Sequence, residues 1–575
     1  MRYKTVSERC KDAIAGSLLF AATAAVVVLQ NSRQGVLWDL SFMLEDAYRI
    51  SMGWVPYRDF PLAYPPLSYA VQAALIKTTG TVFWHHVAYA AVVGGLATVL
   101  TWQIVSRLLR GSVAQPRLAA FLVSAPLAVL GIYCIWPDPS YDADCTFAIL
   151  VSIFLLLYAE GKGFPVSLSF LAGMALVVPA TAKQNTGLAF LGSAGLAILA
   201  LLVIDRRREG VTRGYGAILC GIAAGLALAA VLIQVTAGLR NYLHWTWQFA
   251  AARRLGTRWA SWGSLHDNRF LPWWLAALIA GLVFLSVRRT NRSMTILAAV
   301  MLSVPFVWTS ACLLTGQSQS DNANCLLSLW PFLVIVSLVI SVAAVRQRKG
   351  VTQILPFIVI ATIPAAFLSQ GLWGSTYALW PLLIVLIASV LAALGNWTEH
   401  DATVTTIISV AVALSLLISG GYYVFSNARL TYAKLTDGRL ERSALPALRG
   451  LTVRGPWLPQ FDALAAYAKA KIPAGDGLLI IPGEDPFYYA TGREPRFPVL
   501  LFDTVGNPYS PEEIAVMVRA HDIRWLVVKR QLQLQPEASE REEGNQRLVD
   551  LLRRDCKKTD ELDNYDIYRC VYGRE

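Results

Sequence analysis

The sequence predicts a polytopic α-helical membrane protein with about 13 transmembrane helices and a small C-terminal extracytoplasmic α/β domain. Hydrophobic residues make up 55% of the 575 residues and charged residues only 15%. The mean hydropathy of +0.48 is higher than a water-soluble domain reaches without exposing large apolar patches. Apolar runs long enough to cross a bilayer recur up to about residue 424, and the pattern then changes to short strands and polar turns.

Thirteen apolar runs reach spanning length. The first run lacks a small-residue cleavage pattern after it, so we interpret it as a retained span and not as a signal peptide. The runs lie near residues 13–30, 84–106, 117–135, 145–159, 165–181, 186–204, 215–236, 271–287, 293–315, 326–345, 351–368, 377–395 and 402–424.

The basic residues predict the orientation of these spans. The N-terminus and alternate short loops carry Arg and Lys, whereas loops 136–144, 316–324 and 369–376 contain neither residue. Basic loops stay on the cytoplasmic side, so we expect a cytoplasmic N-terminus in a bacterial inner membrane, with residues 425–575 on the outer face. The net charge of +12 is then a topology signal and does not indicate a nucleic-acid partner.

Two domains are therefore expected, a transmembrane domain over residues 1–424 and an extracytoplasmic α/β domain over 425–575. In the second domain, residues 478–481 and 525–528 are predicted strands, and a helix is predicted after Ser510. The polar stretch 535–545 is expected to be mobile. Within the first domain, the long outer loops 31–83 and 237–270 are where function is expected.

Six of the eight cysteines form pairs that bracket short polar segments on the predicted outer side, where disulfides persist. For the first two pairs the alternative is that these cysteines are small buried apolar residues at the ends of spans. The candidate disulfides are Cys134/Cys145, Cys312/Cys325 and Cys556/Cys570.

The first outer loop contains three acidic residues, Asp39, Glu45 and Asp46. If residues 37–50 form a helix in the membrane interface, Asp39 and Asp46 share one face and Glu45 points elsewhere. A carboxylate beside the lipid head groups suits an enzyme that deprotonates an acceptor hydroxyl while a membrane-bound phosphate leaves. The alternative is that these acids only keep an interfacial loop hydrated.

This loop resembles the first extracytoplasmic loop of GT-C fold glycosyltransferases, particularly bacterial relatives of protein O-mannosyltransferases and lipid A aminoarabinose transferases. The resemblance rests on Asp39, a short helix, the run Gly53-x-x-Pro-Tyr-Arg-Asp-Phe60, and Pro65-Pro66-Leu67. The run Thr-Ala-Lys-Gln-Asn-Thr-Gly over 181–187 resembles a short Lys-Gln turn of the same enzymes. The motifs cover the first third of the chain, and the rest is similar by architecture only.

The resemblance implies a polyprenyl-phosphate sugar donor and an acidic general base in the first loop. Asp39 matches the family's base by its spacing from Gly53 and the Pro-Tyr-Arg-Asp-Phe run. The family usually has two adjacent acids, whereas this chain has Asp39-Leu40 and then Glu45-Asp46. Asp46 and Glu45 therefore stay open as the second and third candidates.

Positively charged side chains are needed at the donor phosphate, because negative charge grows on its oxygens as the sugar bond breaks. The candidate phosphate-binding residues are Lys183, Arg253, Arg254, Arg258 and Arg58.

The second outer loop, 137–145, is acidic, and its Asp142 and Asp144 are candidates to orient the acceptor or to hold a divalent cation such as Mg²⁺ or Mn²⁺. Alternatively these acids form a polar cap between two spans.

The sequence thus predicts a membrane glycosyltransferase that transfers a sugar, with inversion, to an envelope glycan, lipid or protein acceptor on the outer face of the membrane. Asp39 is the predicted base, and inversion is carried over from the family. The alternatives are a lipid-linked sugar transporter or flippase, a non-catalytic envelope assembly protein, and an oligosaccharide ligase of another GT-C lineage. A transporter is expected to carry ionisable residues at mid-membrane, whereas the acids here gather in the outer loops.

Overall fold

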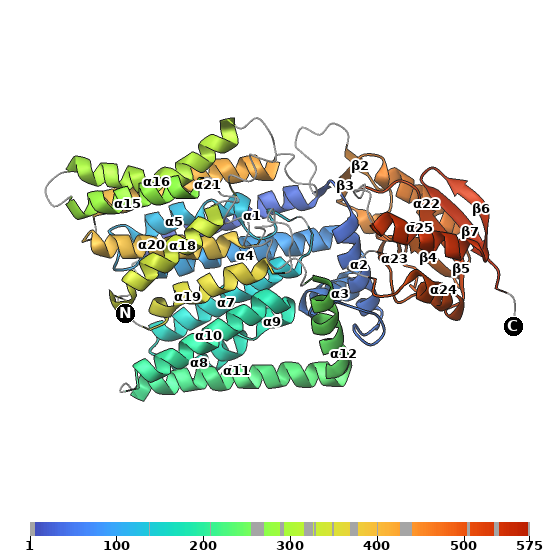
Figure 1. Ribbon diagram of the computed structural model, residues 1–575, viewed down its shortest axis with the longest axis horizontal. Coiled ribbons are helices and arrows are strands. Elements are labelled where there is room, and N and C mark those ends of the chain that lie inside the picture. Colours follow the sequence, from blue (N-terminus) through green and yellow to red (C-terminus); the bar gives the residue numbers. More distant parts are fainter. Residues whose placement is uncertain are drawn as a thin grey trace.

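The computed structural model shows a bundle of long helices with a mixed α/β domain attached at one end (Figure 1). We call this end of the bundle the domain end. The residues that the structure describes are 6–136, 138–206, 209–254, 270–287, 292–315, 326, 329–347, 350–368, 378–399, 401–425, 440–502, 507–533 and 540–572.

The described part of the chain contains eight helices long and apolar enough to cross a membrane and five shorter apolar helices. Each of the thirteen predicted runs coincides with one of them, so the predicted polytopic membrane fold is confirmed. The bundle helices are α1 (Val6–Asn31), α4 (Phe83–Leu108), α5 (Pro116–Ser124), α6 (Leu127–Leu130), α7 (Tyr141–Gly161), α8 (Val166–Ala175), α9 (Val178–Ala182), α10 (Gln184–Ile204), α11 (Glu209–Thr236), α15 (Leu271–Val287), α16 (Arg292–Thr315), α18 (Leu329–Ala343), α19 (Val351–Ala366), α20 (Trp380–Trp397) and α21 (Ala402–Phe425).

Packing inside the bundle follows from apolar surfaces and small residues. Most of α20 is buried, whereas α10 and α11 expose large apolar side chains such as Leu196 and Val235, as expected of helices that face lipid. Between α8 and α11, a Cβ atom on Gly173 would lie 2.1 Å from the Ile218 carbonyl oxygen. Glycine is therefore needed where these two helix backbones come into contact.

Short helices outside the bundle, among them α2, α3 and α12, lie between the ends of the bundle helices and the C-terminal domain (Figure 1). The helix predicted over 37–50 is present as α2. Its place in the membrane interface stays a prediction. These elements are α2 (Trp38–Ser51), α3 (Leu67–Thr79), α12 (Leu239–Leu243), a π-helix (His244–Phe249) and α13 (Ala250–Arg254).

The C-terminal domain is built on a four-stranded sheet of order β4-β5-β7-β6, in which only the β4–β5 pair is parallel. The two predicted strands correspond to β4 and β5, and the predicted helix is α24, which begins with a capping box between Ser510 and Glu513. The domain's elements are β2 (Leu440–Arg442), β3 (Thr452–Arg454), α22 (Trp457–Lys471), β4 (Gly477–Ile481), α23 (Phe487–Thr491), α24 (Pro511–Ala520), β5 (Ile523–Lys529), α25 (Glu540–Arg553), β6 (Cys556–Leu562) and β7 (Tyr565–Cys570).

Two features of the C-terminal domain differ from the prediction. Helix α25 begins at Glu540, so the expectation of a mobile stretch over 535–545 is wrong from that residue onward. A second small sheet has the order β1-β3-β2, and its strand β1 (Arg33–Gln34) comes from the chain that leaves α1. The transmembrane bundle and the C-terminal domain therefore share a sheet.

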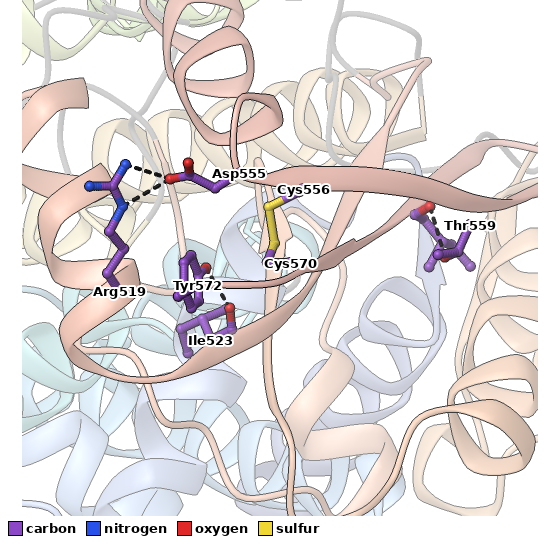
Figure 2. Close-up of a disulfide and its surroundings, with 8 residues drawn as sticks. Arg519, Ile523, Asp555, Cys556, Thr559, Cys570 and Tyr572 are labelled. Atoms are coloured by element: carbon purple, nitrogen blue, oxygen red, sulfur yellow. Dashed lines mark hydrogen bonds and ion pairs between the residues drawn. A yellow bond between two sulfur atoms is a disulfide. The ribbon is translucent and has the colours of Figure 1, made fainter. Parts of the chain in front are cut away.

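The cysteines behave in two different ways. Cys556 and Cys570 form a disulfide that joins the start of β6 to the end of β7, as predicted (Figure 2). The predicted Cys134/Cys145 disulfide is wrong, because the Cys134 thiol donates to the Ala128 carbonyl and the Cys145 thiol to the Pro179 carbonyl, each at 3.5 Å. Cys325 of the third pair lies outside the described residues.

Candidate active site at the domain end of the bundle

Asp39 lies in the first turn of α2 and its side chain is exposed. An acidic residue is favourable there, because the helix dipole places partial positive charge at the N-terminus. Asp39 is also close to Asp138, which is only 1% exposed. Burial raises the pKa of Asp138 well above its ordinary value, the charge of Asp39 raises it further, and the Gln34 side chain lowers it.

Asp138 was not among the candidates that the sequence analysis selected from the acidic loop 137–145. It lies beside Gln34 of β1. The two residues are far apart in the chain, so no local sequence pattern predicts that they are neighbours. One sequence feature could have pointed to Asp138: it stands between Pro137 and Pro139, which favour an extended backbone over continuation of a helix. The structure thus adds a buried carboxyl group beside the exposed one.

Asp142 and Lys183, predicted for two different roles, form an ion pair with each other. Lys183 is 2% exposed and lies in the turn between α9 and α10, while Asp142 is in the first turn of α7. The ammonium group also lies 5.7 Å from the centre of the Tyr141 ring. A pair buried in this way has little net charge, which reduces its attraction for a metal cation.

Asp144 is held by two tyrosines. Its carboxylate accepts hydrogen bonds from the Tyr89 hydroxyl at 2.8 Å and the Tyr133 hydroxyl at 2.6 Å. These contacts join α7 to α4 and to the chain after α6. Asp142 and Asp144 are thus occupied by separate protein partners, and the described residues contain no group of three or more His, Cys, Asp or Glu side chains placed to hold a metal.

The Lys-Gln turn links three parts of the domain end. The Gln184 amide donates to the carbonyl oxygens of Ala63 in the first loop at 3.0 Å and of Thr246 in the π-helix at 3.2 Å. The neighbouring Asn185 donates to the Ala365 carbonyl of α19 at 2.6 Å. The turn therefore fixes the first loop and the π-helix relative to the bundle.

Aromatic residues pack the first loop against the π-helix region. The Tyr57 hydroxyl donates to the Tyr64 carbonyl at 2.6 Å, and the Trp245 indole donates to the Tyr57 carbonyl at 3.2 Å. The rings of Tyr64 and Tyr141 are stacked, with centroids 4.2 Å apart. Trp247 by contrast is 60% exposed, which suits a membrane-interface tryptophan.

The predicted phosphate-binding arginines have different outcomes. Arg58 is an exposed residue whose guanidinium pairs with the neighbouring Asp59 at 2.8 Å. Arg253 and Arg254 belong to α13, but their side chains lie outside the described residues, as does the whole of Arg258. Their role in phosphate binding stays a prediction.

Glu45 and Asp46 lie at the contact between α2 and the C-terminal domain. Glu45 accepts the backbone N–H groups of Tyr488 at 2.7 Å and Tyr489 at 3.4 Å. Asp46 forms an ion pair with Arg49, which also donates to the Pro498 carbonyl at 2.7 Å. Both acids line one small pocket, so the expectation that Glu45 points elsewhere is wrong. Burial raises the pKa of Tyr69 well above its ordinary value, and the charges of Asp46 and Asp39 raise it further.

Replacing Glu45 by Gln is expected to stabilise the protein above neutral pH. Burial raises the pKa of Glu45 from 4.5 to about 8, against the lowering effect of its hydrogen bonds to Tyr488 and Tyr489. The folded state therefore binds the proton more tightly, and the stability from this group is full below about pH 4.5 and is lost as the pH rises through about 8. Thermal unfolding of Glu45→Gln between pH 5 and 9 should show a flatter pH dependence than the wild type; an unchanged pH dependence would contradict the assignment.

Neither a protein-family model nor a curated protein sequence matches this chain. Solved structures do match. The Archaeoglobus fulgidus oligosaccharyltransferase tethered with an acceptor peptide containing the NVT sequon has a TM-score of 0.53 at 11% identity, covering 95% of this chain and 72% of that one. Its apo form has a TM-score of 0.50 at 13% identity, covering 92% and 70%.

ArnT from Cupriavidus metallidurans bound to undecaprenyl phosphate also matches, with a TM-score of 0.41 at 12% identity over 97% of this chain and 98% of that one. The oligosaccharyltransferase matches cover both the helical bundle and the C-terminal domain. The chain therefore has the GT-C fold that its first loop resembles.

Proposed function

We propose that this chain, with its GT-C fold, is a membrane glycosyltransferase that transfers a sugar from a polyprenyl-phosphate donor to an acceptor hydroxyl. The observation that carries the proposal is the exposed Asp39 carboxylate in the first turn of α2, at the domain end of the bundle. The fold supports the class of reaction, since the matched Archaeoglobus protein is an oligosaccharyltransferase.

Asp39 is the best candidate for the general base among the three acids of the first loop. A base must reach the acceptor hydroxyl, and Asp39 is exposed, whereas Glu45 and Asp46 are 3% and 2% exposed. Glu45 is also hydrogen-bonded to α23 and Asp46 is paired with Arg49. These contacts suit a role in holding α2 against the C-terminal domain.

In the proposed reaction, Asp39 takes the proton of the acceptor hydroxyl and the acceptor oxygen forms a bond to the anomeric carbon of the sugar. The bond from that carbon to the phosphate oxygen breaks, and the polyprenyl phosphate leaves with the electron pair. A single displacement of this kind inverts the anomeric configuration. The arginines at 253, 254 and 258 are proposed to stabilise the phosphate charge, with Arg58 as a further candidate. Lys183, predicted for the same role, is instead buried in its ion pair with Asp142.

Asp142 and Asp144, the predicted cation ligands, are held by Lys183 and by two tyrosines, so Asp138 is proposed as a carboxyl group that could contribute to a cation site. Carboxylate oxygens are the ligands that Mg²⁺ and Mn²⁺ prefer, and burial raises the pKa of Asp138, so a nearby cation would favour its ionised form. When bound there, the cation would neutralise charge on the donor phosphate.

The site is proposed to face the outside of a bacterial inner membrane, with the N-terminus in the cytoplasm. This orientation follows from the basic loops on the opposite side of the spans. The transporter alternative is less well supported, because Asp142 and Lys183 lie at the ends of α7 and α10 and not at mid-span. The acceptor is an envelope glycan, a lipid or a secreted protein.

Mass spectrometry of envelope glycans, lipids and secreted proteins from cells with and without the gene tests the proposed function. The expected result is the loss of one sugar from one class of molecule in the deletion strain, and its return when the wild-type gene is supplied. That sugar and its carrier would identify the donor and the acceptor together. Identical profiles from the two strains would overturn the proposal.

A further inference from the structure

The C-terminal domain contacts α2 along its length. The apolar side chains of Leu37, Leu40 and Leu44 are fully buried in the core that α2 shares with the domain. Farther along the helix, the Ser41 hydroxyl donates to the Gly483 carbonyl at 3.3 Å, and Arg49 bonds to the Pro498 carbonyl. The helix that carries Asp39 is therefore packed on the C-terminal domain from its first turn to its last.

The first turn of α2 depends on Gln533. Leu37 occupies the N-cap position, where its apolar side chain cannot bond to the free N–H groups of the helix. Instead, its own backbone N–H donates to the Gln533 side-chain oxygen at 2.6 Å. Gln533 follows strand β5, so a residue of the C-terminal domain fixes the backbone two positions before Asp39.

Gln533 is itself held by a buried cluster of charges. Its backbone N–H donates to Glu484 at 3.2 Å, and Glu484 pairs with Lys529 at 2.6 Å. Lys529 also pairs with Asp485 at 2.8 Å, and Asp485 accepts the Tyr565 hydroxyl at 2.9 Å. The side chains of Lys529, Glu484 and Asp485 are at most 1% exposed, so the segment that carries Gln533 is attached to a buried cluster of ion pairs.

We propose that Gln533 is a positioning residue for Asp39, through which the C-terminal domain fixes the first turn of the catalytic helix. This inference rests on the proposed function of Asp39 as the base. Because Glu45, Arg49 and the apolar face also hold α2, loss of Gln533 should loosen only the first turn. Transfer would fall because the carboxylate is misplaced, while the fold and the donor-binding surface remain.

The test uses the full-length protein with Gln533→Leu, which removes the acceptor oxygen, and Gln533→Glu, which keeps one. Gln546→Leu is the matched control, because Gln546 is an exposed residue of α25 that bonds only to Asp550 within the described residues. Three readouts are needed: sugar transfer in the complemented deletion strain, binding of undecaprenyl phosphate in nanodiscs, and amide hydrogen exchange over residues 35–41.

Gln533→Leu is expected to lower transfer by about tenfold and to speed exchange in the first turn by about fivefold, the effect of losing a typical helix cap. Binding of undecaprenyl phosphate should change by less than about twofold. Gln533→Glu should restore both transfer and slow exchange, and Gln546→Leu should match the wild type. Rescue by Glu is the readout that a role limited to packing would not produce.

The positioning role would be overturned if Gln533→Leu transferred as much sugar as the wild type. It would also be overturned if Gln533→Glu lost as much transfer as Gln533→Leu. An Asp39→Asn variant run in parallel separates this outcome from failure of the proposed function. If Asp39→Asn is inactive and Gln533→Leu is active, the base assignment stands and the positioning role fails. If Asp39→Asn is fully active, the base assignment itself fails.

Discussion

Asp39→Asn is expected to lower sugar transfer by about 10²–10⁴-fold, the usual contribution of a general base. The amide has nearly the same shape as the carboxylate but cannot take up the acceptor proton. Because Asp39 is exposed and the amide has nearly the same shape, the protein should fold and reach the membrane as the wild type does. The measurement is the amount of modified acceptor in a deletion strain that expresses the variant, normalised to the amount of membrane protein.

Glu45→Gln is the matched control, since it makes the same change from carboxylate to amide two turns farther along α2. Glu45 is hydrogen-bonded to α23, so this variant should retain transfer within about threefold of the wild type. A scaffold without catalysis would tolerate both substitutions equally. If Glu45→Gln is inactive and Asp39→Asn is active, the base lies at the interface with the C-terminal domain.

The sequence predicted those parts of the structure that depend on local patterns. Each spanning helix has its own apolar run, and the buried strands β4 and β5 contain the apolar runs 478–481 and 525–528. Helix α24 has its start signal in Ser510 and Glu513, which form the observed capping box. Helix α2 was predicted as a helix over 37–50, so the position of Asp39 in its first turn could also be anticipated.

Contacts between distant segments could not be predicted in this way. Lys183 and Asp142 are 41 residues apart, and each was assigned separately to a ligand because nothing local shows that they pair. The Cys134/Cys145 prediction failed because spacing does not tell in which direction a thiol points. Glu45 looked like a catalytic alternative, since its partners Tyr488 and Tyr489 lie more than 440 residues away.

Lys529→Met is expected to destabilise the C-terminal domain by about 3–5 kcal/mol, the usual cost of removing one partner from a buried ion pair. The variant leaves Glu484 and Asp485 together in a buried site without their cation. Burial already raises the pKa of Glu484, and the Lys529 charge opposes this effect. Because the ammonium group lies 5.1 Å from the Trp457 ring, tryptophan fluorescence during thermal unfolding is a suitable measurement.

Lys469→Met is the matched control, because Lys469 is exposed in the last turn of α22. The midpoint of thermal unfolding of this variant should stay close to that of the wild type. Combining Lys529→Met with Glu484→Gln and Asp485→Asn should recover part of the loss, since the remaining groups are then neutral. A wild-type midpoint for Lys529→Met would show that the cluster does not stabilise the domain. Transfer should fall together with stability in Lys529→Met, whereas Gln533→Leu should lose transfer at a nearly unchanged midpoint. This contrast separates the integrity of the domain from the position of the catalytic helix.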